Sequence, residues 1–308
     1  MFTKTSFGIA SKHVATLAKA TSLTGATLFA GLYFLYKFQN KLIYYPTIPN
    51  KLPSRNEVGF RHPGEANLNY EDVHITTPDG VKLHGWFIKT ETPQTSPTIV
   101  VFQGRAGNIG HRVPFLAALN KYCASNLFII GYRGYSYSEG IPTEKGIKID
   151  SVAAMDYIFS RDDVDPNQVL VLGSSMGGAI TIHALTEKAY PVAGVILENT
   201  FTSLSAMLDV KFPKFSLKLI NYLLVNRWES IEHIHKIKAP ILFIMGLKDE
   251  LIPTKQMEEL EKASTGAVWK EVIKIENGTH NETWSLGEAI YFKGLKDFMD
   301  KVLAEKKD

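Results

Sequence analysis

From about residue 66 to the end of the chain, short apolar runs rich in β-branched residues alternate with longer stretches of helical periodicity. Two early segments, 69–76 and 81–89, alternate apolar and polar residues on either side of the turn from Thr77 to Gly80, which predicts a β-hairpin. The later apolar runs predict strands at 98–102, 127–132, 168–173, 193–197, 240–245 and 271–275. The stretches between them predict helices at 112–123, 145–159, 176–187, 254–263 and 286–303.

Nearly continuous Val, Ile and Leu strands separated by helices are typical of a parallel sheet that is buried on both faces. The pattern therefore predicts a single α/β domain over residues 66–308, with a mostly parallel, twisted sheet and helices on both faces. A polar, Pro-containing linker is expected at 46–65, and a short lid-like insertion at about 201–230. Residues 1–45 form a separate N-terminal arm.

The arm contains 17 uncharged residues between Lys19 and Lys37. As a helix they would span roughly 25 Å, close to the bilayer core of about 30 Å. We expect residues 1–45 to hold a single-pass membrane-anchor helix that takes no part in the chemistry. A cleaved signal peptide, a buried soluble helix and a mitochondrial import sequence remain alternatives, because residues 1–24 are rich in Ser and Thr and lack acids. The organelle, endomembrane or mitochondrial, and the topology stay open.

Charge is distributed unevenly along the chain, whose formal net charge is +3. All seven basic residues of segment 1–56 precede the first acid, Glu57, so the remainder has 34 − 7 = 27 basic and 31 acidic residues. A mildly acidic body argues against nucleic-acid binding. The lone cysteine, Cys123, excludes a disulfide framework and a multi-cysteine metal site. We expect no metal and no cofactor.

The segment from Gly173 to Gly177 reads Gly-Ser-Ser-Met-Gly and joins the strand at 168–173 to the helix at 176–187. This strand–turn–helix setting is the one that a nucleophile elbow requires. Ser175 is therefore the candidate nucleophile, and the backbone N–H of Met176 is the first candidate oxyanion donor. A phosphate-binding turn is the alternative, but the P-loop lysine is missing.

In the α/β-hydrolase fold, the acid and the base follow the serine in that order, each after a later strand. Asp249 follows the strand at 240–245, and His280 follows the last strand. Glu198 is the competing acid and ranks second. His280 would take the proton of Ser175, and Asp249 would fix the histidine tautomer.

The loop after the strand at 98–102 is expected to supply the second oxyanion donor, the backbone N–H of Arg105. The insertion at 201–230 carries apolar side chains that either cap the core or line an acyl channel. The candidate substrate-contacting residues there are Phe201, Phe212 and Phe215.

Several motifs, taken together, resemble those of the α/β-hydrolase-domain-containing protein 13 family, which includes the fungal bud-emergence hydrolases. They are GNIGHR (107–112), YRGYSYSEG (132–140), GSSMGG (173–178), ENTF (198–201), GLKDELIP (246–253) and GTHNETW (278–284). The resemblance implies a single-pass membrane serine hydrolase whose triad matches Ser175, Asp249 and His280. It also implies a link to protein depalmitoylation, because related members are associated with that activity.

One loop departs from the family pattern. The family usually has His-Gly-Asn where this chain has Gln103, Gly104 and Arg105. A backbone donor survives any side chain, so catalysis is expected to persist. The positive charge of Arg105 either favours an anionic group on the substrate or is turned outward.

The sequence thus predicts a serine hydrolase that cleaves carboxylic esters or thioesters through an acyl-enzyme intermediate. The expected substrates are acyl esters or thioesters near a membrane, among them S-acylated proteins and lipid esters. The alternative is a catalytically inactive hydrolase fold that serves as a scaffold at a membrane.

Overall fold

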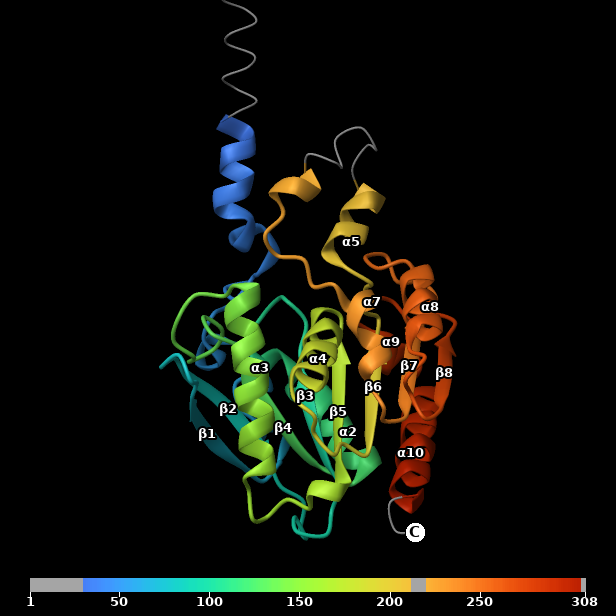
Figure 1. Cartoon of the computed structure of the whole chain (residues 1–308). Helices are drawn as coiled ribbons and strands as arrows, with labels where there is room; N and C mark the ends of the chain where they lie inside the picture. The colour runs from blue at the N-terminus through green and yellow to red at the C-terminus, as the bar shows by residue number, and fades with distance from the viewer. Residues whose placement is uncertain (1–29, 212–219, 306–308) are drawn as a thin grey trace, which may run out of the picture.

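The computed structural model describes residues 30–211 and 220–305, and within these ranges eight strands form one sheet (Figure 1). The strands are β1 (Tyr70–Thr76), β2 (Lys82–Ile88), β3 (Thr98–Phe102), β4 (Asn126–Gly131), β5 (Val169–Ser174), β6 (Gly194–Glu198), β7 (Ile241–Gly246) and β8 (Lys270–Ile275). Their order across the sheet is β1-β2-β4-β3-β5-β6-β7-β8. Strand β2 pairs antiparallel with both β1 and β4, and every later pairing is parallel.

Helices cover both faces of this sheet. The longer ones are α2 (Val113–Cys123), α3 (Glu144–Phe159), α4 (Met176–Glu187), α8 (Thr254–Ala263) and α10 (Glu288–Glu305), and the shorter ones are α5 (Leu204–Lys211), α7 (Ser230–His233) and α9 (Thr283–Leu286). Short 3₁₀ turns lie at Pro53–Arg55, Pro63–Ala66, Ile109–Arg112, Pro166–Gln168 and Ile234–Lys236.

Two apolar cores lie on opposite faces of the sheet, because successive side chains of a strand point to opposite sides. In β3, Val100 and Phe102 belong to the core that also contains buried residues of α3, α4 and α8. Ile99 and Val101 of the same strand belong to the core formed with α2 and α10. Strand β3 is buried along its whole length, as the continuous apolar run predicts.

The predicted hairpin, the mostly parallel sheet and the helices on both faces are confirmed, with strand ends that differ from the prediction by at most one residue. Residues 30–43 are helical, but most of the predicted anchor segment lies outside the described residues. Within the described ranges, no helix combines the length and the apolar character needed to cross a membrane.

The chain that follows helix 30–43 is packed against the domain. Tyr44 is buried in the core, and its hydroxyl donates to Asn226 Oδ1 at 2.9 Å and accepts from Trp228 Nε1 at 3.0 Å. The backbone of Tyr45 accepts a hydrogen bond from the N–H of Gly107 and donates one to the carbonyl of Arg105, each at 3.1 Å. These contacts fix the end of the N-terminal helix beside the loop that follows β3.

Candidate active site

Ser175 lies in the sharp turn between β5 and α4, with φ 56° and ψ −124°. Non-glycine residues rarely adopt this backbone, and it persists only where the surroundings enforce it. A Cβ at Gly177 would lie 1.8 Å from the carbonyl oxygen of Phe102, and one at Gly173 would lie 2.4 Å from the oxygen of Gly177. Glycine is therefore required on both sides of Ser175.

Strand β6 and the residues after it hold the strained turn in place. The N–H of Ser175 donates to the carbonyl of Glu198 at 2.9 Å. The hydroxyl of Thr200 and the N–H of Gly178 donate to the carbonyl of Ser175, at 2.7 and 3.0 Å. Both polar groups of the Ser175 backbone are thus bonded, and the side chain is held at the carboxyl ends of the parallel strands.

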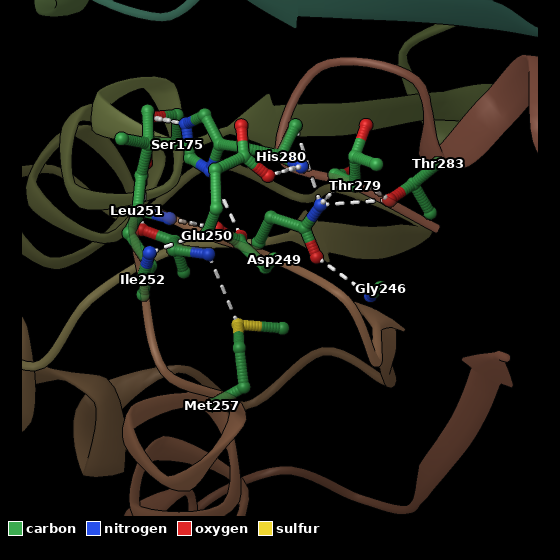
Figure 2. A network of polar contacts seen from close by, with 12 residues as sticks. Ser175, Gly246, Asp249, Glu250, Leu251, Ile252, Met257, Thr279, His280 and Thr283 are labelled. Carbon is green, nitrogen blue, oxygen red and sulfur yellow. Dashed lines mark hydrogen bonds and ion pairs between the residues drawn. The ribbon is translucent and has the colours of Figure 1, made fainter. Parts of the chain in front are cut away.

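Ser175, His280 and Asp249 form a continuous chain of hydrogen bonds (Figure 2). His280 Nε2 lies 2.9 Å from Ser175 Oγ, and His280 Nδ1 lies 2.8 Å from Asp249 Oδ2. The other carboxylate oxygen of Asp249 accepts the N–H groups of Leu251 and Ile252, both at 2.8 Å. The Asp249 side chain is 1% exposed. This geometry suits a serine nucleophile with a histidine base held in one tautomer by a carboxylate.

Asn199 connects the loops that carry the acid and the histidine. Its side-chain oxygen accepts the N–H of Gly246 at 2.8 Å, and its amide nitrogen donates to Thr283 Oγ1 at 2.9 Å and to the carbonyl of His280 at 3.3 Å. Sequence reasoning assigned no role to Asn199, although it lies within the ENTF motif. Its position directly after a buried parallel strand was the available signal.

Glu198, the competing acid, occupies a different position. Its carboxylate is buried and accepts the hydroxyl of Tyr291 at 2.7 Å. Burial raises the pKa of the Glu198 carboxyl to about 7. The carboxylate that meets His280 Nδ1 is that of Asp249.

The loop after β3 passes close to Ser175. A Cβ at Gly104 would lie 3.4 Å from Ser175 Cβ and 3.8 Å from its Oγ. The next residue, Arg105, is fixed through its carbonyl, which accepts the hydroxyl of Tyr135 at 2.7 Å and the N–H of Tyr45. Arg105 and Met176, the two candidate oxyanion donors, line the same cavity as Ser175 and His280.

That cavity has a volume of about 400 Å³ and largely aliphatic walls. Its wall includes Ser175 and His280, together with Phe201 and residues of α5, of segment 220–224 and of helix 30–43. Its aliphatic wall residues include Leu35, Leu42, Ile43, Leu204, Met207, Leu208, Ile220, Leu223, Leu224, Leu251 and Ile252. Phe201, a candidate substrate-contacting residue, lines this cavity, whereas Phe212 and Phe215 lie outside the described residues.

The end of the N-terminal arm lies beside the active site, because helix 30–43 and Tyr45 form part of the cavity wall. That residues 1–45 take no part in the chemistry stays a prediction. The hydrophobic N-terminal segment predicts a membrane anchor, but hydrophobicity alone does not show whether the end of the segment also packs beside the active site. The sequence pattern carried no sign of the difference.

Comparison with known proteins bears on both the family and the fold. Residues 122–277 match the model of the prolyl oligopeptidase family. The α/β-hydrolase domain-containing protein WAV2 of Arabidopsis thaliana is 37% identical, and the match covers 92% of this chain and 94% of WAV2. Protein bem46 of Schizosaccharomyces pombe is 36% identical, with 89% of this chain and 90% of bem46 covered.

The chain belongs to the α/β-hydrolase-domain-containing protein 13 family. An esterase of Pyrococcus furiosus superposes with a TM-score of 0.63 at 20% identity, covering 79% of this chain and 94% of the esterase. That likeness shows the α/β-hydrolase fold. An uncharacterized membrane protein of Saccharomyces cerevisiae is also similar, 31% identical over 86% of this chain and 90% of its own length. Family and fold together support a serine hydrolase.

Proposed function

We propose that this family member is a serine hydrolase that cleaves carboxylic esters or thioesters of medium or long acyl chains, with Ser175 as nucleophile, His280 as base and Asp249 as acid. The observation that carries the proposal is the unbroken hydrogen-bond chain from Ser175 Oγ through His280 to Asp249. An inactive scaffold would have no need of a strained serine aligned in this way.

In the first half-reaction, His280 Nε2 accepts the proton of Ser175 Oγ as Oγ attacks the substrate carbonyl carbon. The negative charge that develops on the carbonyl oxygen is stabilised by the N–H groups of Met176 and Arg105. The intermediate collapses, the bond to the alcohol or thiol breaks, and His280 gives its proton to the departing atom. The acyl group remains on Ser175, and water, deprotonated by His280, releases it as a carboxylic acid.

The aliphatic cavity supports an acyl chain as the group that Ser175 retains. Its volume is within the range of small-molecule sites, and its walls offer mainly hydrocarbon to a ligand. Each buried methylene is worth about 0.8 kcal/mol, which corresponds to a several-fold increase in kcat/KM until the cavity is full.

Apolar side chains around the cavity support a position close to lipid. Tyr33, Phe34 and Tyr36 on helix 30–43 are each about half exposed, and Tyr222 is 83% exposed. Helix 30–43 continues the hydrophobic N-terminal segment, and one relative is named a membrane protein. We propose that the N-terminal segment anchors the protein in a membrane and that S-acylated proteins or lipid esters reach the cavity there.

The test is kcat/KM of detergent-solubilised full-length protein for thioesters of one thiol, from acetyl to palmitoyl, below their micelle concentrations. We expect kcat/KM to rise several-fold with each methylene at first and then to level off. A profile that is flat or falls beyond butyryl would exclude the acyl cavity and leave a short-chain esterase.

A further inference from the structure

A second cavity, of about 450 Å³, also opens onto Ser175 and His280. Its walls include the loop 103–106, Arg112 at the start of α2, Glu198 of β6 and Trp284 of α9. Because Ser175 and His280 line both cavities, the two meet at the nucleophile. An ester or thioester has an acyl chain on one side of its carbonyl carbon and an alcohol or thiol on the other. Two cavities that meet at one serine therefore suit the two parts of such a substrate.

The second cavity differs from the first in the polar groups of its wall. Gln103 is 2% exposed, and its side-chain nitrogen Nε2 is buried without a hydrogen-bond partner among the described residues. Its Oε1 accepts from Arg112 Nε at 3.2 Å, which fixes the amide orientation. This nitrogen has almost no accessible surface, so Gln103 acts on a ligand through Arg112, whose guanidinium it orients.

The charge of the wall favours an anionic acceptor. Arg112 donates Nη2 to the carbonyl of Ala106 at 2.7 Å, and its guanidinium bonds to no carboxylate in the described part of the chain. Arg105 adds a second cation. The counter-charge comes from Glu198, whose carboxyl has its pKa raised to about 7 by burial, while burial lowers the pKa of His111 and favours its neutral form.

We propose that the second cavity is the leaving-group subsite, and that Arg112, oriented by Gln103, selects esters and thioesters whose alcohol or thiol carries a carboxylate or a phosphate. The inference rests on the proposed function, in which the first cavity holds the acyl chain. In the tetrahedral intermediate, the substrate carbonyl carbon is bonded to Ser175 Oγ. When the bond from this carbon to the leaving oxygen or sulfur breaks, that atom takes the proton of His280 Nε2. The anionic substituent of the leaving group remains against Arg112.

The experiment compares kcat/KM of the full-length protein for two thioesters that differ in one charge, S-octanoyl-3-mercaptopropionate and S-octanoyl-3-mercaptopropionamide. We expect the carboxylate to be preferred about tenfold, since hydrogen bonds to charged groups contribute about 1.5–3 kcal/mol. Octanoylglycerol with and without a 3-phosphate forms the second pair and reports whether phosphate is the favoured anion. A preference in either pair supports the subsite and identifies its anion, and its absence from both pairs overturns the proposal.

Variants are compared by the ratio of the two rate constants, because the ratio cancels a general loss of activity or folding. Arg112→Gln should bring the ratio close to 1. Gln103→Glu should bring it below 1, because a carboxylate would then pair with Arg112 and repel the anion. Lys121→Gln, which removes an exposed cation of α2, should leave the ratio unchanged.

Two outcomes separate the subsite from the proposed function. Equal rates for the charged and the neutral member of both pairs, or a wild-type ratio in Arg112→Gln and Gln103→Glu, would overturn the subsite and leave the hydrolase. If no ester or thioester of either pair is hydrolysed, the proposed function fails and the subsite fails with it.

Discussion

At the residue scale, the strained backbone of Ser175 and the buried carboxylate of Asp249 depend on polar partners supplied by other segments. The carbonyl of Ser175 has Thr200 and Gly178 as donors, and Asp249 accepts two backbone N–H groups in addition to His280. Such bonds hold the Asp249 carboxylate in place, so that it orients the His280 ring toward Ser175. Substitution of Asp249 and of Glu198 should therefore have clearly different effects on kcat.

Asp249→Asn should lower kcat by about 10⁴, because an amide can donate to His280 Nδ1 and favour the wrong tautomer. Glu198→Gln should lower it by less than about tenfold, since Glu198 bonds to Tyr291 and not to the histidine. Both variants keep the size of the side chain, so each serves as the control for the other. The measurement is kcat with an octanoyl thioester, and the reverse ranking would assign the acid to Glu198.

Glu198 should also make stability depend on pH. Its carboxyl has a pKa of about 7 in the folded protein against 4.5 as the ordinary value. Its protonated form is therefore favoured by folding, and the associated stability is complete below pH 4.5 and lost as pH rises through 7. The loss amounts to about 3 kcal/mol.

Denaturant unfolding between pH 4.5 and 8 measures this effect. As pH rises, the unfolding free energy of the wild type should fall relative to that of Glu198→Gln, because glutamine does not ionise. A difference that stays constant over this range would mean that Glu198 titrates normally in the folded protein.

At the element scale, helix 30–43 and the segment after residue 220 hold each other over the apolar cavity. Gln39 Oε1 accepts the N–H of Val225 at 2.8 Å and that of Asn226 at 3.2 Å. The side chain of Asn226 donates to Asn40 Oδ1 at 2.8 Å and accepts the hydroxyl of Tyr44. These bonds join two segments that both line the cavity.

Gln39→Ala should therefore lower kcat/KM for an octanoyl thioester by about tenfold, because the variant loses the hydrogen bonds to Val225 and Asn226, at about 1 kcal/mol each, and the wall loosens. The acetyl thioester, which does not reach that wall, should react as before. Lys41→Ala is the matched control, since Lys41 is exposed on the same helix and does not line the cavity. Equal losses for both chain lengths in Gln39→Ala would show that the helix does not shape the acyl site.

The strands and main helices were predictable because each is specified by local periodicity. The run at Thr98–Phe102 is apolar throughout, and the structure buries all of it. The bonds of Asn199 and Gln39 were not predictable in the same way. Each joins segments far apart in the chain, 47 residues for Asn199 and Gly246 and 186 for Gln39 and Val225, and a single polar side chain carries no signal of its distant partner.

At the scale of the whole molecule, the parallel sheet brings the carboxyl ends of β3, β5, β6, β7 and β8 to the same end of the molecule. Helix 30–43 and α5 lie over these strand ends (Figure 1). A cavity with aliphatic walls and a second cavity whose wall carries Arg112 and Glu198 meet there at Ser175. The arrangement explains how one serine could serve a substrate with an apolar acyl chain and a charged leaving group. It depends entirely on Ser175 acting as the nucleophile.

Labelling with a fluorophosphonate probe tests that claim most directly. The wild type should be labelled at Ser175 alone, and His280→Ala should lose nearly all labelling because the hydroxyl loses its base. Ser175→Ala should abolish labelling with the fold intact by circular dichroism, and Ser174→Ala, one residue away, should be labelled like the wild type. Persistent labelling of Ser175→Ala, or a wild-type protein that does not react, would contradict the account.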